Sequence, residues 1–274
     1  MVLAMAGFAC EDMFIKSAAR DLPTGQVLTM IGLAGFAVFA AMTRAAGDPV
    51  WDRAYLSRGM IVRSGFEIAG RLFYTLAFVL VPLTTATAIL QAAPLVVVAG
   101  AALVLGERVD WRRWVAVATG LVGVMLILRP GTEGFDALAL LAVLGMLGFA
   151  GRDLATRAAA PGLSHRQMGV TGFAVMTVAG LVIWAVEGRA ALPDARGVAL
   201  LAAGAVFAVA AYHALTIAMR TGEVSAVAPW RYTRLVFAGL VGLAVFGEVP
   251  DTLTIIGSLI VVASGIAALV VGRR

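Results

Sequence analysis

Runs of about 20 mostly apolar residues follow one another along this 274-residue chain, and they restrict its fold more than any other feature. A helix of that length is what the hydrocarbon core of a bilayer requires. Only 14% of the residues are charged, against about 25% in soluble domains. The expected spans are 1–19, 25–43, 57–80, 83–104, 111–128, 137–158, 167–187, 197–219, 224–246 and 252–271. The sequence therefore predicts an all-α integral membrane protein with ten transmembrane helices.

The chain also resembles itself when it is shifted by 141 residues. Gly7-Phe8-Ala9 falls on Gly148-Phe149-Ala150, and without a gap Leu105-Gly106-Glu107 falls on Phe246-Gly247-Glu248. Duplicated apolar halves are typical of membrane carriers, whose substrate site lies where the halves meet. The duplication therefore predicts a carrier with a shared central site.

Two five-helix repeats are expected, over residues 1–136 and 137–274. Because five is an odd number, the second repeat would enter the membrane from the opposite face, as an inverted repeat. Arginines orient the chain, since short cytoplasmic loops carry an excess of basic residues. With a cytoplasmic N-terminus, the inner segments hold Arg44, Arg53, Arg58, Arg108, Arg112, Arg113, Arg157, Arg166, Arg220, Arg273 and Arg274. The outer loops hold Arg20, Arg129, Arg189 and Arg196. We therefore expect a multi-pass protein of the bacterial inner membrane with both termini in the cytoplasm.

Several short motifs lie at the end of the fourth expected span and in the fifth. They are Thr84-Thr85-Ala86-Thr87-Ala88, Pro94, Leu105-Gly106-Glu107, Trp111-Arg112-Arg113-Trp114, Gly120, Gly123 and Arg129-Pro130-Gly131. With these motifs the chain resembles the drug/metabolite transporter superfamily, specifically its EamA-type ten-span carriers. The resemblance covers essentially the whole chain and implies transport, while similar proteins export amino acids or import diverse metabolites. The second half matches less well, since Leu235 stands where Pro94 stands in the first.

Polar side chains inside the expected spans are the candidates for substrate binding, because a charge at mid-bilayer costs several kcal/mol and is rarely kept without a role. The candidates are Glu11, Glu67, Arg71, Tyr74, Gln91, Arg152, Tyr212, His213, Trp230, Arg231 and Arg234. Deep cations are Arg63, Arg71, Arg152, Arg231 and Arg234, and deep anions are Glu11, Asp12, Glu67 and Asp153. The excess of one cation predicts a ligand with a carboxylate or another anionic group.

Other charges suggest structural pairs within single helices. Asp12 with Lys16, and Asp153 with Arg157, have the i, i+4 spacing of favourable helix pairs. Arg63, Glu67 and Arg71 share one helix face, either as an internal ion-pair ladder or for binding or proton coupling.

Two further expectations concern contacts between different spans. Glu11 and Arg152 occupy equivalent positions with opposite charge, so we expect them to face each other between the halves. Glu107 and Glu248 are each expected to cap the helix that follows them.

The function that these features favour is secondary transport of a small polar, carboxylate-bearing metabolite, such as an amino acid or a derivative, by alternating access. Uptake of S-adenosylmethionine or riboflavin, known in similar families, is an alternative, and a lipid-handling membrane protein is another. The sequence shows no catalytic constellation, metal-ligand spacing, cofactor motif or ATP-binding motif, so energy would come from protons or an exchanged metabolite. The high pI of about 10.1 reflects membrane orientation rather than a nucleic-acid partner. The oligomeric state is expected to be a monomer or a homodimer.

Overall fold

All of the secondary structure that the computed structural model describes is helical. The structure describes residues 1–274 except 105, 108, 131–135, 159–161, 222–227 and 272–274, and it describes no side chain for 157–158, 219–221, 228–229 and 271. The helices are α1 (Val2–Ala18), α2 (Thr24–Ala45), η1 (Arg53–Leu56), α3 (Arg58–Leu80), α4 (Leu83–Leu90), α5 (Ala93–Val104), α6 (Trp111–Leu128), α7 (Ala139–Ala158), α8 (His165–Glu187), α9 (Ala195–Thr221), η2 (Ala228–Tyr232), α11 (Thr233–Phe246) and α12 (Thr252–Val271).

Seven helical segments in the described part of the chain are long and apolar enough to cross a membrane. They are Thr24–Ala45, Leu83–Val104, Trp111–Leu128, Ala139–Thr156, His165–Glu187, Ala195–Ala218 and Thr252–Val270. The prediction of an all-α membrane protein is therefore confirmed. Three expected spans are helical but miss this standard. α1 has 17 residues, α11 has 14, and α3 carries several charged residues along its length.

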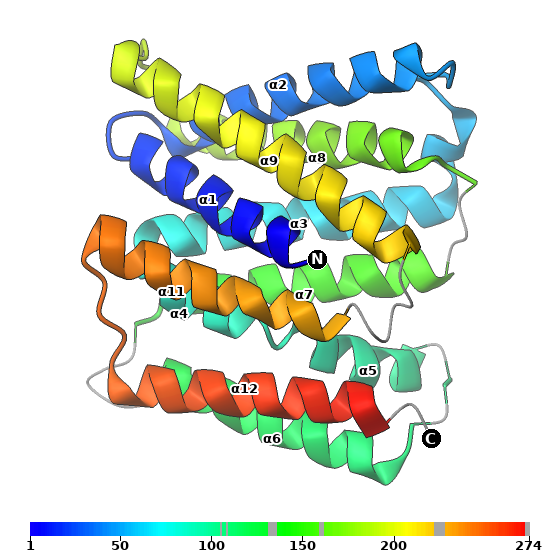
Figure 1. Ribbon diagram of the computed structural model, residues 1–274, viewed down its shortest axis with the longest axis vertical. Helices are drawn as coiled ribbons and strands as arrows, with labels where there is room; N and C mark the ends of the chain where they lie inside the picture. The colour runs from blue at the N-terminus through cyan, green and yellow to red at the C-terminus, as the bar shows by residue number, and fades with distance from the viewer. Residues whose placement is uncertain (105, 108, 131–135, 159–161, 222–227, 272–274) are drawn as a thin grey trace.

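The helices lie side by side with their axes running in roughly one direction, from α2 at one edge to the α6–α12 pair at the other (Figure 1). The most extensive contacts join α2 with α8, α3 with α7, α1 with α9 and α6 with α12. Each of these pairs joins a helix of the first half to a helix of the second. The 141-residue shift exchanges α1 with α7 and α3 with α9, so it maps this set of contacts onto itself.

Small residues allow the closest of these helix contacts. A Cβ atom added at Gly148 of α7 would lie 2.5 Å from the Cα of Gly70 on α3. At the equivalent contact of α1 with α9, a Cβ added at Gly7 would lie 2.8 Å from the Cβ of Ala211. Membrane helices gain van der Waals contact when small residues let their backbones approach, so both contacts are tight for the same reason.

The two Gly-Glu motifs end their helices in the same way. Gly106 and Gly247 both adopt left-handed backbone conformations, with φ of 68° and 66°. The amide of Glu107 donates to the carbonyl of Ala101, and the amide of Glu248 donates to the carbonyl of Gly242. A left-handed glycine followed by such a bond satisfies carbonyls at a helix end. The repeat is therefore visible in local backbone structure as well as in sequence.

The fourth expected span is broken in its middle. Pro94 has no N–H to donate to the carbonyl of Leu90, and a turn at Gln91 and Ala92 interrupts the helix between α4 and α5. The second half is broken at the equivalent point without such a proline, where η2 gives way to α11 after Tyr232. The two breaks are in contact, since the side chain of Gln91 at the first donates to the carbonyl of Arg231 at the second, at 3.0 Å.

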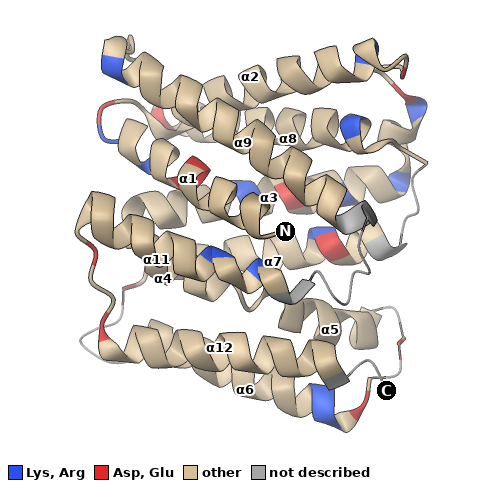
Figure 2. Cartoon of the chain, in the orientation of Figure 1, with Lys and Arg blue, Asp and Glu red and all other residues tan. Residues whose placement is uncertain are grey.

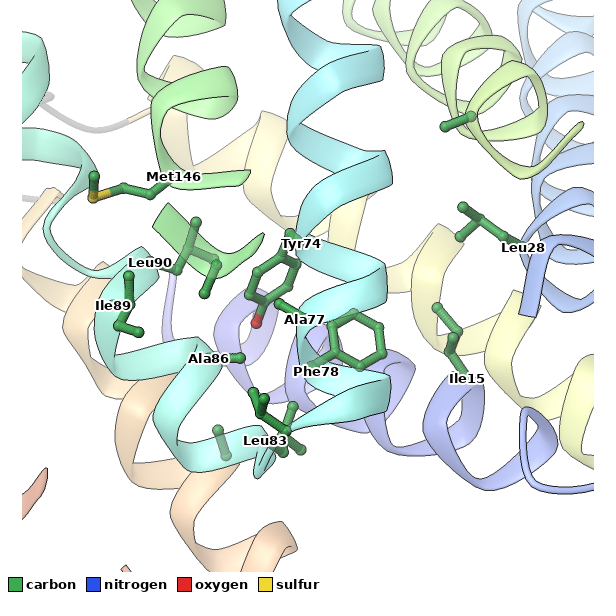
Figure 3. Packing of buried hydrophobic residues seen from close by; sticks show 14 of the residues in the cluster. Ile15, Leu28, Tyr74, Ala77, Phe78, Leu83, Ala86, Ile89, Leu90 and Met146 are labelled. Carbon is green, nitrogen blue, oxygen red and sulfur yellow. The ribbon is translucent and has the colours of Figure 1, made fainter. Parts of the chain in front are cut away.

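The main apolar core extends across the bundle, with buried residues from α1, α2, α3, α4, α6, α7, α8, α9, α11 and α12. Figure 3 shows Tyr74, Ala77 and Phe78 of α3 next to Leu83 and Ala86 of α4, and all five are buried. The rings of Tyr74 and Phe78 meet edge to face, with centroids 5.1 Å apart. This packing holds Tyr74 rigidly with its hydroxyl beside polar groups of α1 and α4.

Candidate functional site

A cavity of about 100 Å³ lies among residues of both halves. It is lined by Met5, Phe8, Glu67, Arg71, Tyr74, Leu90, Gln91, Ala93, Pro94, Phe149, Arg152, Asp153, Tyr212, Leu215, Arg231, Tyr232 and Arg234. Six pairs within this set differ by 141 residues, namely Phe8 with Phe149, Arg71 with Tyr212, Tyr74 with Leu215, Leu90 with Arg231, Gln91 with Tyr232 and Ala93 with Arg234. We call it the central cavity. It lies where equivalent parts of the two halves meet.

Charged side chains gather around this cavity. Figure 2 shows acidic and basic segments in the middle of the molecule on α1, α3, α7 and α11, in addition to those at helix ends and in loops. Glu67 is buried and pairs with Arg63 at 2.9 Å and with Arg152 at 3.4 Å. Arg152 also donates to Asp153 Oδ1 from Nε at 3.0 Å and from Nη2 at 2.7 Å. One network of charges therefore links α3 to α7.

A second network links α1 to α3 and α11. Asp12 is fully buried, and its Oδ2 accepts hydrogen bonds from Arg234 Nη2 at 2.6 Å and from the Tyr74 hydroxyl at 3.2 Å. Arg71 Nη1 donates to the buried Glu11 at 3.1 Å. The guanidinium of Arg234 also lies over the rings of Phe8 and Tyr74. Asp12 and Glu11 thus fix two arginines that line the cavity, without lining it themselves.

One predicted i, i+4 charge pair is wrong, and the second involves a side chain outside the described residues. Asp12 contacts Arg234 and not Lys16, while Asp153 contacts Arg152 and Arg231. The side chain of Arg157, the other predicted partner of Asp153, lies outside the described residues. Helix spacing allowed a pair of Asp12 with Lys16, but Arg234 of α11 is the residue that contacts the Asp12 carboxylate.

The expected pairing of Glu11 with Arg152 is also wrong. Glu11 contacts Arg71, and Arg152 contacts Glu67 and Asp153. Opposite charge at equivalent positions of the two halves therefore did not identify a contact between Glu11 and Arg152.

A larger cavity of about 340 Å³ adjoins the central one and shares Arg152, Asp153, Tyr212, Leu215 and Arg231 with it. We call it the vestibule. Its other lining residues are Arg63, Thr156, Leu163, His165, Met168 and Thr216. They come from the N-terminal ends of α3 and α8 and the C-terminal ends of α7 and α9, so the vestibule lies toward one end of the bundle.

The opposite end of the bundle is tied together by Lys16 and Glu248. Lys16 Nζ donates to Glu248 Oε1 and to the carbonyl of Val81, both at 2.7 Å. Glu248 Oε2 accepts the backbone amide of Leu83, the first residue of α4, at 2.7 Å. We call this arrangement the Lys16–Glu248 clasp. Glu248 was expected to cap the helix after it, but it caps α4 of the other half instead.

Eight of the eleven predicted binding residues line the central cavity, and three do not. Glu11 lies behind Arg71, and Trp230 is 56% exposed and absent from the lining. His213 lines an apolar groove between α2 and α9, and its ring centroid lies 5.9 Å from that of His165. These three residues are polar and deep in the sequence pattern, but their helices turn them away from the cavity.

Part of the lining was not among the binding residues predicted from the sequence. Phe8 and Phe149 line the cavity as an equivalent pair, and Tyr232 lines it opposite Gln91 in the repeat. The 141-residue shift carried this signal, because it aligned Phe8 with Phe149 and Gln91 with Tyr232. Asp153 was assigned only to a structural pair, whereas it lines both cavities.

The chain is similar to several proteins that are named as transporters. Residues 1–129 match the EamA-like transporter family. The S-adenosylmethionine uptake transporter of Rickettsia prowazekii is 25% identical over 206 residues, which are 74% of this chain and 68% of the relative. The riboflavin transporter of Vibrio cholerae is 31% identical over 185 residues, 67% of this chain and 61% of the relative. The pseudopaline exporter of Pseudomonas aeruginosa PAO1 is 27% identical over 268 residues, 97% of this chain and 93% of the relative.

A solved structure supports the fold over the whole length. One crystal structure of a protein with 19% identity superposes with a TM-score of 0.63 and covers 99% of this chain and 98% of its own. The architecture is therefore shared with a known protein well beyond the region that the family match covers.

Proposed function

We propose that this protein, whose residues 1–129 match the EamA-like transporter family, is a secondary carrier of a small metabolite that bears a carboxylate, such as an amino acid or a derivative. The observation that carries the proposal is the central cavity, which is lined from both halves by six charged residues, four arginines and two acids, of α3, α7, η2 and α11. A polar cavity between two related halves is the usual position of a carrier's substrate site. Glu67, Arg71, Tyr74, Gln91, Arg152, Tyr212, Arg231 and Arg234 are proposed to line that site.

The charges of the site favour an anionic group on the substrate. Glu11 and Asp12 each hold one arginine, which leaves Arg63, Arg152 and Arg231 to share Glu67 and Asp153. Arg231 has the weakest partner, since its Nη1 is 3.8 Å from Asp153 Oδ2. A guanidinium in this position can bind a carboxylate through two parallel hydrogen bonds.

We further propose that ten spans form two inverted five-helix repeats, 1–136 and 137–274. The symmetric helix contacts and the matching ends at Gly106 and Gly247 support this arrangement. α1, α3 and α11 would complete the ten. The charges that lower the hydropathy of α3 face α1 and α7, where protein rather than lipid surrounds them.

The order of features along α3 supports alternating access. Arg63 lines the vestibule, and Glu67, Arg71 and Tyr74 line the central cavity. The carbonyl of Val81 accepts a hydrogen bond from Lys16 in the Lys16–Glu248 clasp. Val81 is seven residues beyond Tyr74, about 10 Å along a helix. The cavity thus adjoins the vestibule toward one end, and the clasp ties helix ends together at the other, as expected of a carrier open to one side. With the orientation that the arginines favour, the vestibule faces the cytoplasm and both termini lie there, in a bacterial inner membrane.

Uptake of S-adenosylmethionine is the second candidate. The Rickettsia relative is named for it, and the compound joins an amino-acid head group to an aromatic base. The aromatic rings of Phe8, Phe149, Tyr212 and Tyr232 in the lining offer surfaces for such a base.

Uptake into proteoliposomes tests the carrier proposal. Purified protein would be reconstituted and assayed by counterflow with each protein amino acid, S-adenosylmethionine and riboflavin. We expect uptake of at least one carboxylate-bearing compound and its loss in Arg231→Ala, while Arg166→Ala, at a loop pair outside both cavities, keeps it. Lipid scrambling without solute uptake would contradict the proposal.

A further inference from the structure

We propose that Asp153 and Arg231 together bind a zwitterionic head group, the α-ammonium and α-carboxylate of an amino acid or an amino-acid derivative. The inference rests on the proposed carrier function and deepens it, because it requires an ammonium on the substrate as well as a carboxylate. It is carried by the geometry of this one pair, which differs from every other central pair that the structure describes.

The Arg231–Asp153 contact is the longest ion pair among the described residues. Its 3.8 Å separation is beyond hydrogen-bond distance. The other central pairs are 2.6–3.4 Å long. Arg231 and Asp153 are therefore close enough to attract each other and too far apart to satisfy each other.

Both side chains are also the most accessible charges of the central networks. The side chain of Arg231 is 34% exposed and that of Asp153 is 30% exposed, while no other central charge exceeds 19%. Both line the central cavity and the vestibule. Both charges are therefore accessible to a substrate from either cavity.

Each of the two residues is held by a contact that leaves its free atoms facing the cavities. Arg152 binds Oδ1 of Asp153 through two hydrogen bonds, so Oδ2 remains for a ligand. The side chain of Gln91 donates to the backbone carbonyl of Arg231 at 3.0 Å, at the break between η2 and α11. Rigid support of this kind lowers the entropy that ligand binding costs.

A zwitterion fits this pair better than a ligand with one charge. The carboxylate accepts hydrogen bonds from Arg231, and the ammonium, on the adjacent carbon, donates to Asp153 Oδ2. A carboxylic acid without the amine would place its charge near Asp153 with no compensation. An amine without the carboxylate would lie among Arg231, Arg152 and Arg71, which repel it.

Thermal stabilisation of the protein by matched compounds tests the inference. The probes are the twenty protein amino acids and S-adenosylmethionine, and the tightest is compared with its desamino and decarboxylated analogues in thermal stabilisation of the purified protein. We expect each analogue to bind about tenfold more weakly or worse, as the loss of one charge-assisted hydrogen bond predicts. If no amino acid or derivative binds, or if an analogue binds equally well, the inference is wrong.

Two variants assign the charges to their partners. Asp153→Asn should abolish the preference for the amino acid over its desamino analogue, and Arg231→Gln should abolish the preference over the decarboxylated one. A merely structural role would weaken all probes alike. Asp48→Asn and Arg166→Gln, a pair at 3.0 Å outside both cavities, are the matched controls and should keep both preferences.

The two proposals fail in different ways. Uptake of riboflavin, which has neither charged group, without binding of any amino acid would overturn the head-group site and leave the carrier. Absence of uptake for every probe would overturn the carrier itself.

Discussion

At the scale of single residues, Arg231 and Arg234 show how differently two neighbouring arginines are used. Arg234 is held at 2.6 Å by the fully buried Asp12, while Arg231 is a third exposed and only loosely paired. The first contact stabilises the junction of α1 with α11. The second leaves a charge available to a ligand. We therefore expect substitution of Arg234 to lower mainly the stability of the protein, and substitution of Arg231 to lower mainly transport.

Arg234→Met should destabilise the protein because it leaves the Asp12 carboxylate buried without a cation. Breaking a buried pair in this way costs about 3–5 kcal/mol. Arg231→Met should cost less than about 1 kcal/mol, as for an exposed pair. Unfolding free energy in detergent measures both, and the Asp12→Asn/Arg234→Met double variant should lose less than the sum of the single changes. Equal losses for Arg231→Met and Arg234→Met would contradict this assignment.

Asp251, outside the spans, should give a small pH dependence of stability. A hydrogen bond from Arg129 lowers its pKa to about 2. Because the folded pKa lies below the ordinary value of about 4, the pair stabilises above pH 4 and its contribution is lost as the pH falls from about 4 to 2. The Asp251 side chain is 55% exposed, and solvent screening limits the contribution to less than about 1 kcal/mol. Melting temperatures of wild type and Asp251→Asn should converge over that range; a constant difference would contradict the prediction.

At the scale of elements, the contacts that close the molecule join helix ends of different halves. The Lys16–Glu248 clasp links α1, the start of α4 and the end of α11. Glu187 similarly accepts the first two amides of α2, at 2.9 Å each, from the end of α8. Helix N-termini favour carboxylates, so capping across the halves fixes where these helix ends lie.

Lys16→Met should loosen the clasp and make that end of the cavity easier to open. The measurement is the rate at which a cysteine at the buried Thr84, in a Cys10→Ala background, reacts with a charged maleimide. We expect a severalfold faster reaction, because Glu248 loses its cation. Arg20→Met is the matched control, since Arg20 also lies over the Phe246 ring, at 5.2 Å like Lys16, and should leave the rate unchanged. An unchanged rate in Lys16→Met would exclude the clasp as a gate.

At the scale of the whole molecule, the symmetric helix contacts and the distribution of arginines together favour one orientation of the protein in the membrane. Single cysteines at Trp51, Leu192 and Val249, all exposed positions in loops, would report it in the Cys10→Ala background. In intact cells, an impermeant maleimide should label residues 192 and 249 and leave residue 51 unlabelled until the membrane is permeabilised. Labelling of residue 51 alone would reverse the orientation, and with it the side to which the vestibule opens.

The apolar runs, the 141-residue repeat and the short motifs determined the helical class, most helix positions and the resemblance to EamA-type carriers, which the family match confirms. They also identified eight residues of the cavity lining, because charges are rarely kept inside a membrane span without a partner. These features are local or periodic, so a sequence displays them directly.

Only the tertiary structure decided which charges meet. Asp12 pairs with Arg234, 222 residues away, rather than with Lys16 on its own helix, and Lys16 pairs with Glu248. An i, i+4 pair on a helix surface contributes about 0.5 kcal/mol or less, whereas a buried charge without a partner costs several. Packing that satisfies the buried carboxylates therefore overrides the local pairing, and no spacing in the sequence records which distant helix supplies the partner.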